Sequence, residues 1–283
     1  SLMTHDRWTP RGVHRVPIHF GHGVRGNLYF KDGAPTPMPV VVWLHPLSYH
    51  SGYNEGYGVQ GTTVYQRLAE NGFAVIAYDQ CGFGLRLLEG RDFYKNHPRW
   101  SKLGRMVMDA QAAVSFAVEG RGAAKSAIPE FDTKRVFLLG YSSGALTAMY
   151  AGALDDRVAG VACFSGWTPL RNARNARATG GNRRFWEQHA LQPRLGLFDG
   201  RESEMPFDYD DVLGLVLPKP CLVVTLRRDR FADFNAVAEV IDRVRSARPR
   251  IAKGSLAWLA PDDTNRFQVD QHQEFINWAK TLE

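Results

Sequence analysis

Residues 140–144 read Gly-Tyr-Ser-Ser-Gly, with Ser142 at the centre. The apolar run Val136–Leu139 precedes them, and a helix-like run, Ala145–Leu154, follows at once. A nucleophilic serine needs such a sharp strand-to-helix turn, because the turn projects its hydroxyl from the end of a sheet. The two glycines leave room where a Cβ would clash, and the helix N-terminus directs N–H groups at a developing anion. We therefore predict that Ser142 is a nucleophile for acyl transfer, the alternative being a helix N-cap serine.

Strand-like and helix-like runs alternate along most of the chain. The first two strand-like runs alternate apolar and polar residues, as half-buried antiparallel strands do, and the later ones are continuously apolar, as buried parallel strands are. This order predicts an α/β fold with a mainly parallel sheet flanked by helices. The predicted strands are Val13–Phe20, Val24–Phe30, Val40–Leu44, Phe73–Tyr78, Arg135–Leu139, Val158–Phe164, Pro220–Leu226 and Ser255–Leu259, and the predicted helices are Gly61–Asn71, Lys102–Glu119, Ala145–Leu154, Phe234–Arg245 and Val269–Leu282.

Residues 168–218 interrupt this alternation with pieces rich in Arg, Gly and Pro. A segment of this length is too long for a plain connection between two strands. We therefore expect a single domain, residues 1–283, with a cap or lid insertion at 168–218. Because ligands of α/β sheets bind at the carboxyl ends of the strands, the insertion is expected to pack there.

The chain resembles the α/β-hydrolase superfamily, and within it bacterial acetyl-xylan-esterase and dienelactone-hydrolase-type proteins. The resemblance extends from about Val13 to the end of the chain. It implies an α/β-hydrolase fold and a serine hydrolase, but says little about the substrate, because this fold hosts many reactions. Its motifs are His45-Pro46-Leu47, Tyr78-Asp79-Gln80-Cys81-Gly82-Phe83-Gly84, the Ser142 turn and Arg228-Asp229-Arg230-Phe231-Ala232.

The resemblance also implies which groups assist Ser142. The N–H of Ser143 is the expected first oxyanion donor, and Leu47 is the expected second, since the proline before it has no N–H. His45 is expected to brace that loop. Asp229 follows a predicted strand where the superfamily keeps its triad acid, with Asp233 as the fallback and a surface ion pair as the alternative.

The triad histidine is missing from the loop where the superfamily pattern places it. Residues 260–267 contain no histidine, and Thr264 or Asn265 stands at the expected place. Neither can act as a base near neutral pH. His272 is the candidate because it alone follows the predicted acid, which preserves the order Ser, Asp, His, provided that its helix begins later than Val269. The alternatives are a core role for His272, a base among His45, His50 and His189, and a site with no triad base.

Several aromatic residues are candidates for substrate contact. Tyr49, Tyr53 and Tyr57 share one glycine-containing loop, and Trp167 follows a predicted strand. Exposed aromatic loop residues suit sugar or aryl ligands. His189, in the insertion, is a further candidate for the same pocket. The alternative for these residues is packing.

Composition and charge exclude several classes of protein. The 283 residues are 44% hydrophobic and 23% charged, which is typical of a globular protein. The net charge of +6 is spread too evenly for a nucleic-acid partner, and no aromatic ladder accompanies the basic run Arg171–Arg184. That run is either an anion-recognising lid or a solvated face.

The three cysteines, Cys81, Cys163 and Cys221, are widely spaced, which argues against disulfides and against a zinc site. With Met3 as the expected native start, the N-terminus lacks a signal-peptide core, though a signal removed before it is left open. No run approaches the ~20 apolar residues of a membrane span. We therefore expect a cytoplasmic protein without a membrane partner.

The leading hypothesis is a serine hydrolase that cleaves a carboxylic ester through an acyl-enzyme on Ser142, without a metal or an organic cofactor. The expected partner is a small-molecule ester, such as a sugar or aryl ester, and a homo-oligomer is left open. The missing histidine keeps two alternatives open. One is a non-catalytic protein that binds a ligand in the same pocket, and the other is a lyase or transferase.

Overall fold

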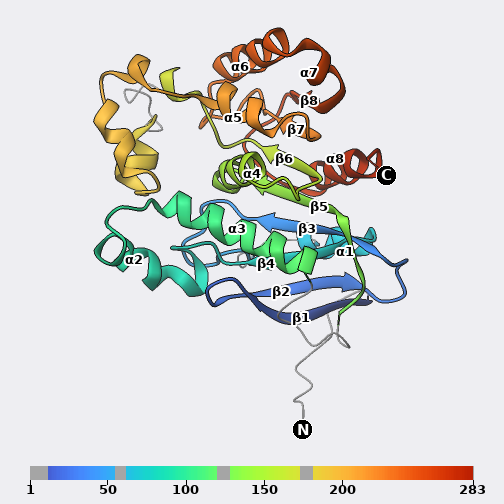
Figure 1. Ribbon diagram of the computed structural model, residues 1–283. Helices are drawn as coiled ribbons and strands as arrows, with labels where there is room; N and C mark the ends of the chain where they lie inside the picture. The colour runs from blue at the N-terminus through green and yellow to red at the C-terminus, as the bar shows by residue number, and fades with distance from the viewer. Residues whose placement is uncertain (1–11, 55–61, 120–127, 173–180, 283) are drawn as a thin grey trace.

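A sheet of eight strands runs through the centre of the molecule (Figure 1). The computed structural model describes residues 12–54, 62–119, 128–172 and 181–282. The strands lie in the order β1-β2-β4-β3-β5-β6-β7-β8. β2 pairs antiparallel with β1 and β4, and the other neighbouring strands are parallel. The strands are Val13–Phe20 (β1), Val24–Lys31 (β2), Met38–Leu44 (β3), Ala74–Tyr78 (β4), Phe131–Tyr141 (β5), Gly160–Phe164 (β6), Cys221–Val224 (β7) and Leu256–Leu259 (β8).

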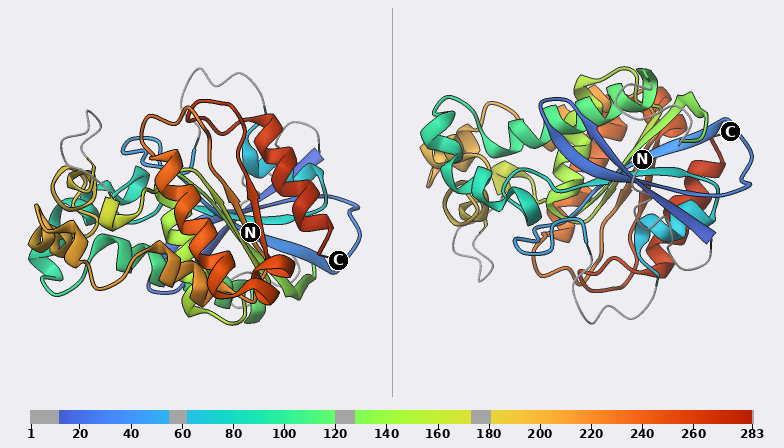
Figure 2. Two further views of the ribbon diagram at one scale, coloured as in Figure 1. Left: turned by 90° about the horizontal axis from the view of Figure 1, so that it is seen from above. Right: turned by 90° about the horizontal axis from the view of Figure 1, so that it is seen from below.

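Helices cover both faces of this sheet, which is why its parallel strands are so strongly apolar (Figure 2). Every residue of β4, β6 and β7 is buried. α1 and α8 pack on one face, while α3, α4, α5 and α6 contribute to the core on the other. The helices are Val64–Glu70 (α1), Leu87–Asn96 (α2), Lys102–Glu119 (α3), Ser143–Leu154 (α4), Tyr209–Val216 (α5), Phe234–Ala247 (α6), Pro249–Ser255 (α7) and Val269–Lys280 (α8).

The predicted strands and helices are present, and β1 and α3 have the predicted bounds. The α/β-hydrolase fold expected from the sequence is confirmed. Three helices, α2, α5 and α7, were not predicted. α2 buries Gly90 and Phe93 but leaves Leu88 largely exposed, so its apolar residues do not follow a clean helical period. α5 and α7 are short and lie in stretches where no period is clear.

The segment between β6 and β7, which was expected to be an insertion, has two parts. α5, at its end, packs beside α4 and α6 in the helix layer. Residues 181–207 contain a π-helical turn, Arg184–Gln188, and short 3₁₀ helices. In Figure 1 they lie at the left, near α2 and α3, on the side toward which β3 points. The Leu103 N–H of α3 donates to the Leu191 carbonyl at 3.1 Å.

All three cysteines are buried and free. Within the described ranges, no helix combines the length and the apolar character that crossing a membrane demands.

Candidate active site

Ser142 lies at the sharp turn between β5 and α4. Its backbone has φ 54° and ψ −121°, in the left-handed half of conformational space that a residue with a side chain rarely adopts. The Ser142 N–H donates to the Phe164 carbonyl at 2.9 Å, and the Ser142 carbonyl accepts from the Ala145 N–H at 2.9 Å. Strain of this kind costs on the order of 1–3 kcal/mol and persists mainly at functional sites. The turn therefore has the conformation that a nucleophilic serine requires.

The two glycines of the motif are required by close backbone contacts. A Cβ on Gly140 would lie 2.1 Å from the Gly144 carbonyl oxygen, and one on Gly144 would lie 1.9 Å from the Leu44 carbonyl oxygen. Neither position can accept a side chain without moving the backbone. The spacing of the motif thus follows from how closely α4 approaches β3 and β5.

His45 braces the loop after β3, as the resemblance implied. Its Nδ1 donates to the Pro46 carbonyl at 2.7 Å, and its Nε2 accepts the Gln80 N–H at 3.0 Å. The Gln80 side chain donates in turn to the His45 carbonyl at 2.7 Å. Burial lowers the pKa of His45 to about 4, so the ring is neutral at pH 7. Both ring nitrogens are engaged, and His45 is therefore a bracing residue rather than a base. Leu47 follows in the same loop.

Asp79 joins two loops at the carboxyl ends of β3 and β4. Its carboxylate accepts the Tyr53 N–H at 2.9 Å and the Leu85 N–H at 2.8 Å. The chain passes so close to this carboxylate that a Cβ on Gly52 or Gly84 would collide with it. Asp79 thus holds the tyrosine-containing loop against the sheet. The sequence showed Asp79 within a motif, but no role was assigned to it.

Asp229 lies after β7 and is buried. Its Oδ1 accepts the Phe231 N–H at 2.8 Å and the Asn265 Nδ2 at 2.9 Å. Its Oδ2 is buried and has no hydrogen bond within the described part of the chain. Asp233, the fallback acid, instead caps α6 by accepting the Ala236 N–H at 3.2 Å. The structure therefore favours Asp229 over Asp233 as the acid of the site.

Asn265 occupies the position of the expected triad histidine. Its Nδ2 donates to Asp229, and its Oδ1 accepts a hydrogen bond from the Tyr141 hydroxyl. Burial, followed by the charge of Asp229, raises the pKa of Tyr141, so this hydroxyl stays protonated and acts as the donor. Tyr141 directly precedes Ser142. A hydrogen-bonded chain, Tyr141–Asn265–Asp229, thus has a neutral carboxamide where a basic imidazole would stand, and a carboxamide cannot accept the serine proton.

The condition set for His272 is not met, because α8 begins at Val269. His272 lies in the first turn of that helix, 3% exposed, with its ring centroid 4.8 Å from that of Phe267. Burial is the main cause that lowers its pKa to about 4. The residue that bonds Asp229 is Asn265, which lies in the loop before α8 and not in the helix itself. His272 is therefore placed as a core residue, and the fixed start of α8 is the physical reason.

His189 and Tyr49 are brought together from distant parts of the sequence. The Tyr49 hydroxyl and His189 Nδ1 are 2.7 Å apart. Tyr49 is 40% exposed and also contacts the Phe83 ring, with centroids 5.0 Å apart. Burial, followed by the charges of Arg184 and Lys102, lowers the pKa of His189, so its imidazole is neutral at pH 7. Both residues were predicted to contact substrate, and their contact links the segment 181–207 to the loop after β3.

Two of the predicted substrate residues pack into the core instead. Tyr53 is buried, with its ring 5.6 Å from Tyr65 and its hydroxyl 3.4 Å from that of Tyr29. Trp167 is buried with its ring 5.1 Å from that of Tyr209. Substrate contact is wrong for both, because aromatic rings of the helix layers cover them. Tyr57 and most of the basic run, residues 173–180, lie outside the described residues.

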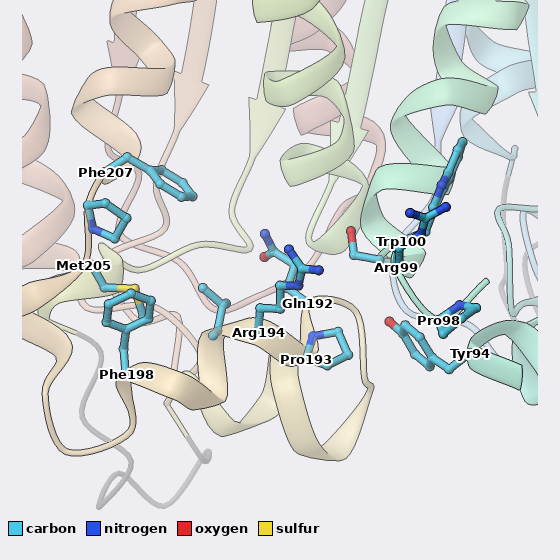
Figure 3. A pocket seen from close by; sticks show the side chains of 13 residues that line it. Tyr94, Pro98, Arg99, Trp100, Gln192, Pro193, Arg194, Phe198, Met205 and Phe207 are labelled. Atoms are coloured by element: carbon cyan, nitrogen blue, oxygen red, sulfur yellow. The ribbon is translucent and has the colours of Figure 1, made fainter.

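A cavity of about 330 Å³ opens between the α2–α3 connection and residues 192–207 (Figure 3). None of the predicted site residues lines it. Among the described residues, no cluster of three or more His, Cys, Asp or Glu side chains could hold a metal ion. The cavity is lined chiefly by Tyr94, Trp100, Gln192, Phe198, Met205 and Phe207.

Similar solved structures share this fold over nearly the whole chain. A glucuronoyl esterase from Solibacter usitatus matches with a TM-score of 0.69 at 18% identity, covering 95% of this chain and 81% of that one. A family 15 carbohydrate esterase from Caldicellulosiruptor kristjansonii, a glucuronoyl esterase, gives 0.67 at 16% identity, covering 97% and 80%. The Pyrococcus furiosus esterase Pf2001 gives 0.58 at 17% identity, covering 97% and 96%.

No curated protein matches the chain. The family model described as serine aminopeptidase, S33, matches residues 40–212, from β3 through the Ser142 turn into α5. This match covers more than half of the chain and includes the Ser142 turn. The chain is therefore an α/β-fold hydrolase that belongs to the serine aminopeptidase S33 family.

Proposed function

We propose that this chain hydrolyses a small carboxylic ester through an acyl-enzyme formed on Ser142. The observation that carries this proposal is the strained backbone of Ser142 at the start of α4. The N–H groups of Ser143 and Leu47 hold the oxyanion that forms when Ser142 Oγ attacks the carbonyl carbon. The similar structures that are named esterases support an ester as the substrate class. The exposed Tyr49 ring suits a sugar or aryl group beside it.

In this proposal His189 takes the role that chain order assigned to His272. Its Nδ1 bonds the Tyr49 hydroxyl, and Nε2 has no hydrogen bond with any described residue. His189 Nε2 accepts the Ser142 proton as the ester bond is attacked and returns it to the leaving alcohol. A water molecule, deprotonated in the same way, then releases the acid. A neutral ring at pH 7 is the form that this step requires.

The position of His189 relative to two loops supports this role. β5, which carries Ser142, lies between β3 on one side and β6 and β7 on the other. The segment 184–189 contacts the loops on both sides. His189 bonds Tyr49 after β3, and the Arg184 guanidinium lies 4.4 Å from the centre of the Phe231 ring after β7. The segment therefore bridges the loops that flank Ser142, which supports the proposal that it is a lid over the site.

A second candidate function is ligand binding without turnover, and Asn265 is the observation that favours it. The Asn265 carboxamide replaces the base with a group that only donates and accepts hydrogen bonds. Such a site would retain its pocket and oxyanion donors but would not activate Ser142. The two functions differ in whether Ser142 reacts.

Reaction with a fluorophosphonate probe and turnover of 4-nitrophenyl acetate separate these functions. Ester hydrolysis predicts labelling of the wild type, no labelling of Ser142→Ala, and a loss of kcat on the order of 10²-fold or more for His189→Ala. His272→Ala is the matched control, expected to lose stability while kcat changes little. An unlabelled, inactive wild type that is folded would establish the non-catalytic function. Retained kcat in His189→Ala would remove His189 as the base.

A further inference from the structure

Three basic side chains, those of Arg184, His189 and Lys102, lie at the contact between residues 181–207 and α3. The His189 N–H donates to the Arg184 carbonyl at 2.9 Å, which places them one π-helical turn apart. The Tyr94 hydroxyl donates to the carbonyl of Ala190 and accepts the Lys102 N–H at 3.1 Å. The charges of Arg184 and Lys102 both act on the imidazole of His189 and lower its pKa. We call Arg184, Lys102 and His189 the basic cluster, because both cations act on the imidazole.

No carboxylate of the described residues pairs with Arg184 or Lys102 within 4.0 Å. The Arg184 guanidinium instead lies 4.4 Å from the Phe231 ring centre, and the Lys102 amino group lies 5.6 Å from the Tyr94 ring centre. Arg183, next in sequence, shows the contrast, because its guanidinium is 3.1 Å from the Glu187 carboxylate. As far as the described residues go, the cluster therefore holds half-buried positive charge without a bonded anion.

A ligand anion would offset the partial loss of hydration at Arg184 and Lys102. Burial lowers the pKa of both Arg184 and Lys102, since both cations lose part of their hydration. The charge of Asp229 partly opposes this effect at Arg184, although no ion pair forms. Aromatic faces attract the two cations but do not replace a charged partner. A ligand anion that reaches Arg184 or Lys102 would receive charge-assisted hydrogen bonds.

Two members of the cluster contact the loops that flank Ser142. Arg184 stacks on Phe231, two residues after Asp229, and His189 bonds Tyr49, two residues after Leu47. We propose that Arg184 and Lys102 bind a carboxylate carried by the substrate, so that the preferred esters are half-esters of dicarboxylic acids or other esters with a second, ionised carboxyl group. This inference rests on the proposed ester hydrolysis. The competing explanation is that Arg184 only offsets the charge of Asp229.

The test compares kcat/KM for two aryl esters, mono-4-nitrophenyl glutarate and neutral 4-nitrophenyl butyrate. We expect the wild type to prefer the glutarate ester. Arg184→Gln and Lys102→Gln should each reduce the ratio of the two kcat/KM values by about 10- to 100-fold, as for the loss of a hydrogen bond to a charged group. Arg183→Gln, beside the cluster but paired with Glu187, should keep the wild-type ratio. If Arg184→Gln reduces kcat/KM equally for both esters, Arg184 only offsets the charge of Asp229, and the proposal is overturned.

A binding measurement separates this inference from the proposed function. Glutarate is titrated by calorimetry into the Ser142→Ala protein, which cannot turn over an ester. We expect binding that weakens at least ~10-fold when Arg184→Gln is added, and that weakens with added salt. If neither ester is cleaved but glutarate binds in this way, ester hydrolysis fails and the carboxylate site stands. If glutarate does not bind, or binds equally without Arg184, the carboxylate site is ruled out whether or not the neutral ester is cleaved.

Discussion

Asn265 Nδ2 lies 2.9 Å from Asp229 Oδ1 and donates a hydrogen bond to it. The proposed acid of the site is therefore bonded to a carboxamide, which Tyr141 holds from the other side. The loop after β8 thus has the connection to Asp229 that a triad would use. What it lacks is a group that takes up a proton near neutral pH.

Asn265→His should create a base at this position. The imidazole would bond Asp229 through one nitrogen and face Ser142 with the other, as in a serine triad. We expect faster fluorophosphonate labelling and a kcat for 4-nitrophenyl acetate higher by on the order of 10²-fold, the usual contribution of general base catalysis. Stopped-flow or plate kinetics across pH 5–9 would measure kcat for the wild type and for Asn265→His.

Asn265→Asp and the double variant Asn265→His with Ser142→Ala serve as controls, and neither should gain activity. Tyr141→Phe should be combined with Asn265→His as well, because the Tyr141 hydroxyl loses its amide acceptor in the single variant. No gain in either form, with the fold intact, would show that the loop does not direct residue 265 toward Ser142.

Gly144→Ala should disrupt the turn at Ser142. The new Cβ would lie 1.9 Å from the Leu44 carbonyl oxygen, in backbone that cannot withdraw without moving β3 or α4. We expect a loss of at least about 2 kcal/mol in the free energy of unfolding, or failure to fold. Gly254→Ala in α7 is the matched control, since nothing lies within 4 Å of its Cβ position. Urea unfolding compares the two, and a stable Gly144→Ala protein would contradict the close packing of the turn.

The stability of the protein should fall as the pH drops below about 6.5. Burial lowers the pKa of His272 from 6.5 to about 4 in the folded state, and that of His45 likewise. Between these values the unfolded chain binds protons that the folded chain does not. Stability is therefore fully present above pH 6.5 and is lost toward pH 4, by up to ~1.4 kcal/mol per pH unit for each histidine.

His272→Leu removes one of these groups and should make that dependence shallower. Urea unfolding at pH 7.5, 6.0 and 5.0 measures the slope. Val269→Ala, at a half-exposed position of the same helix, changes no titrating group and should retain the wild-type slope. An unchanged slope in His272→Leu would mean that His272 titrates in the folded protein as it does in the unfolded chain.

Asp109→Ala should destabilise the fold strongly. Asp109 is buried in α3, where its carboxylate accepts Arg86 Nη1 at 2.8 Å and Arg105 Nε at 3.0 Å. Removing one member of a buried ion pair leaves the others uncompensated, which costs about 3–5 kcal/mol. Arg86 also donates to the Asp79 carbonyl, so the loops beside Ser142 should loosen too.

Asp156→Ala provides the comparison, because its ion pair with Lys219 has an exposed carboxylate. Exposed pairs contribute little, so its urea midpoint should stay near that of the wild type. If Asp109→Ala and Asp156→Ala lower the urea midpoint equally, a structural role for the ion-pair network around Arg86 is contradicted.

The sequence alone was enough to predict the layered fold and the sharp turn at Ser142. Strands such as β4 and β6 are buried on both faces, so they read as continuous apolar runs, and α3 repeats its apolar residues at the helical period. The glycines beside Ser142 are local requirements of a strained turn, and local requirements are visible in a short stretch of residues. Asp229 was predicted as the acid because it follows a recognisable strand, at the place where the superfamily that the chain resembles keeps this residue.

The tertiary structure decided which side chains meet. Chain order selected His272, but α8 begins before it and buries it, while the preceding loop brings Asn265 to Asp229. Tyr53 and Trp167 have the same residue types as exposed binding aromatics, and only their packing against Tyr65 and Tyr209 places them in the core. The contact between His189 and Tyr49 joins residues 140 positions apart. Such contacts depend on how segments without a regular period fold over the sheet, and no local pattern of residues encodes that path.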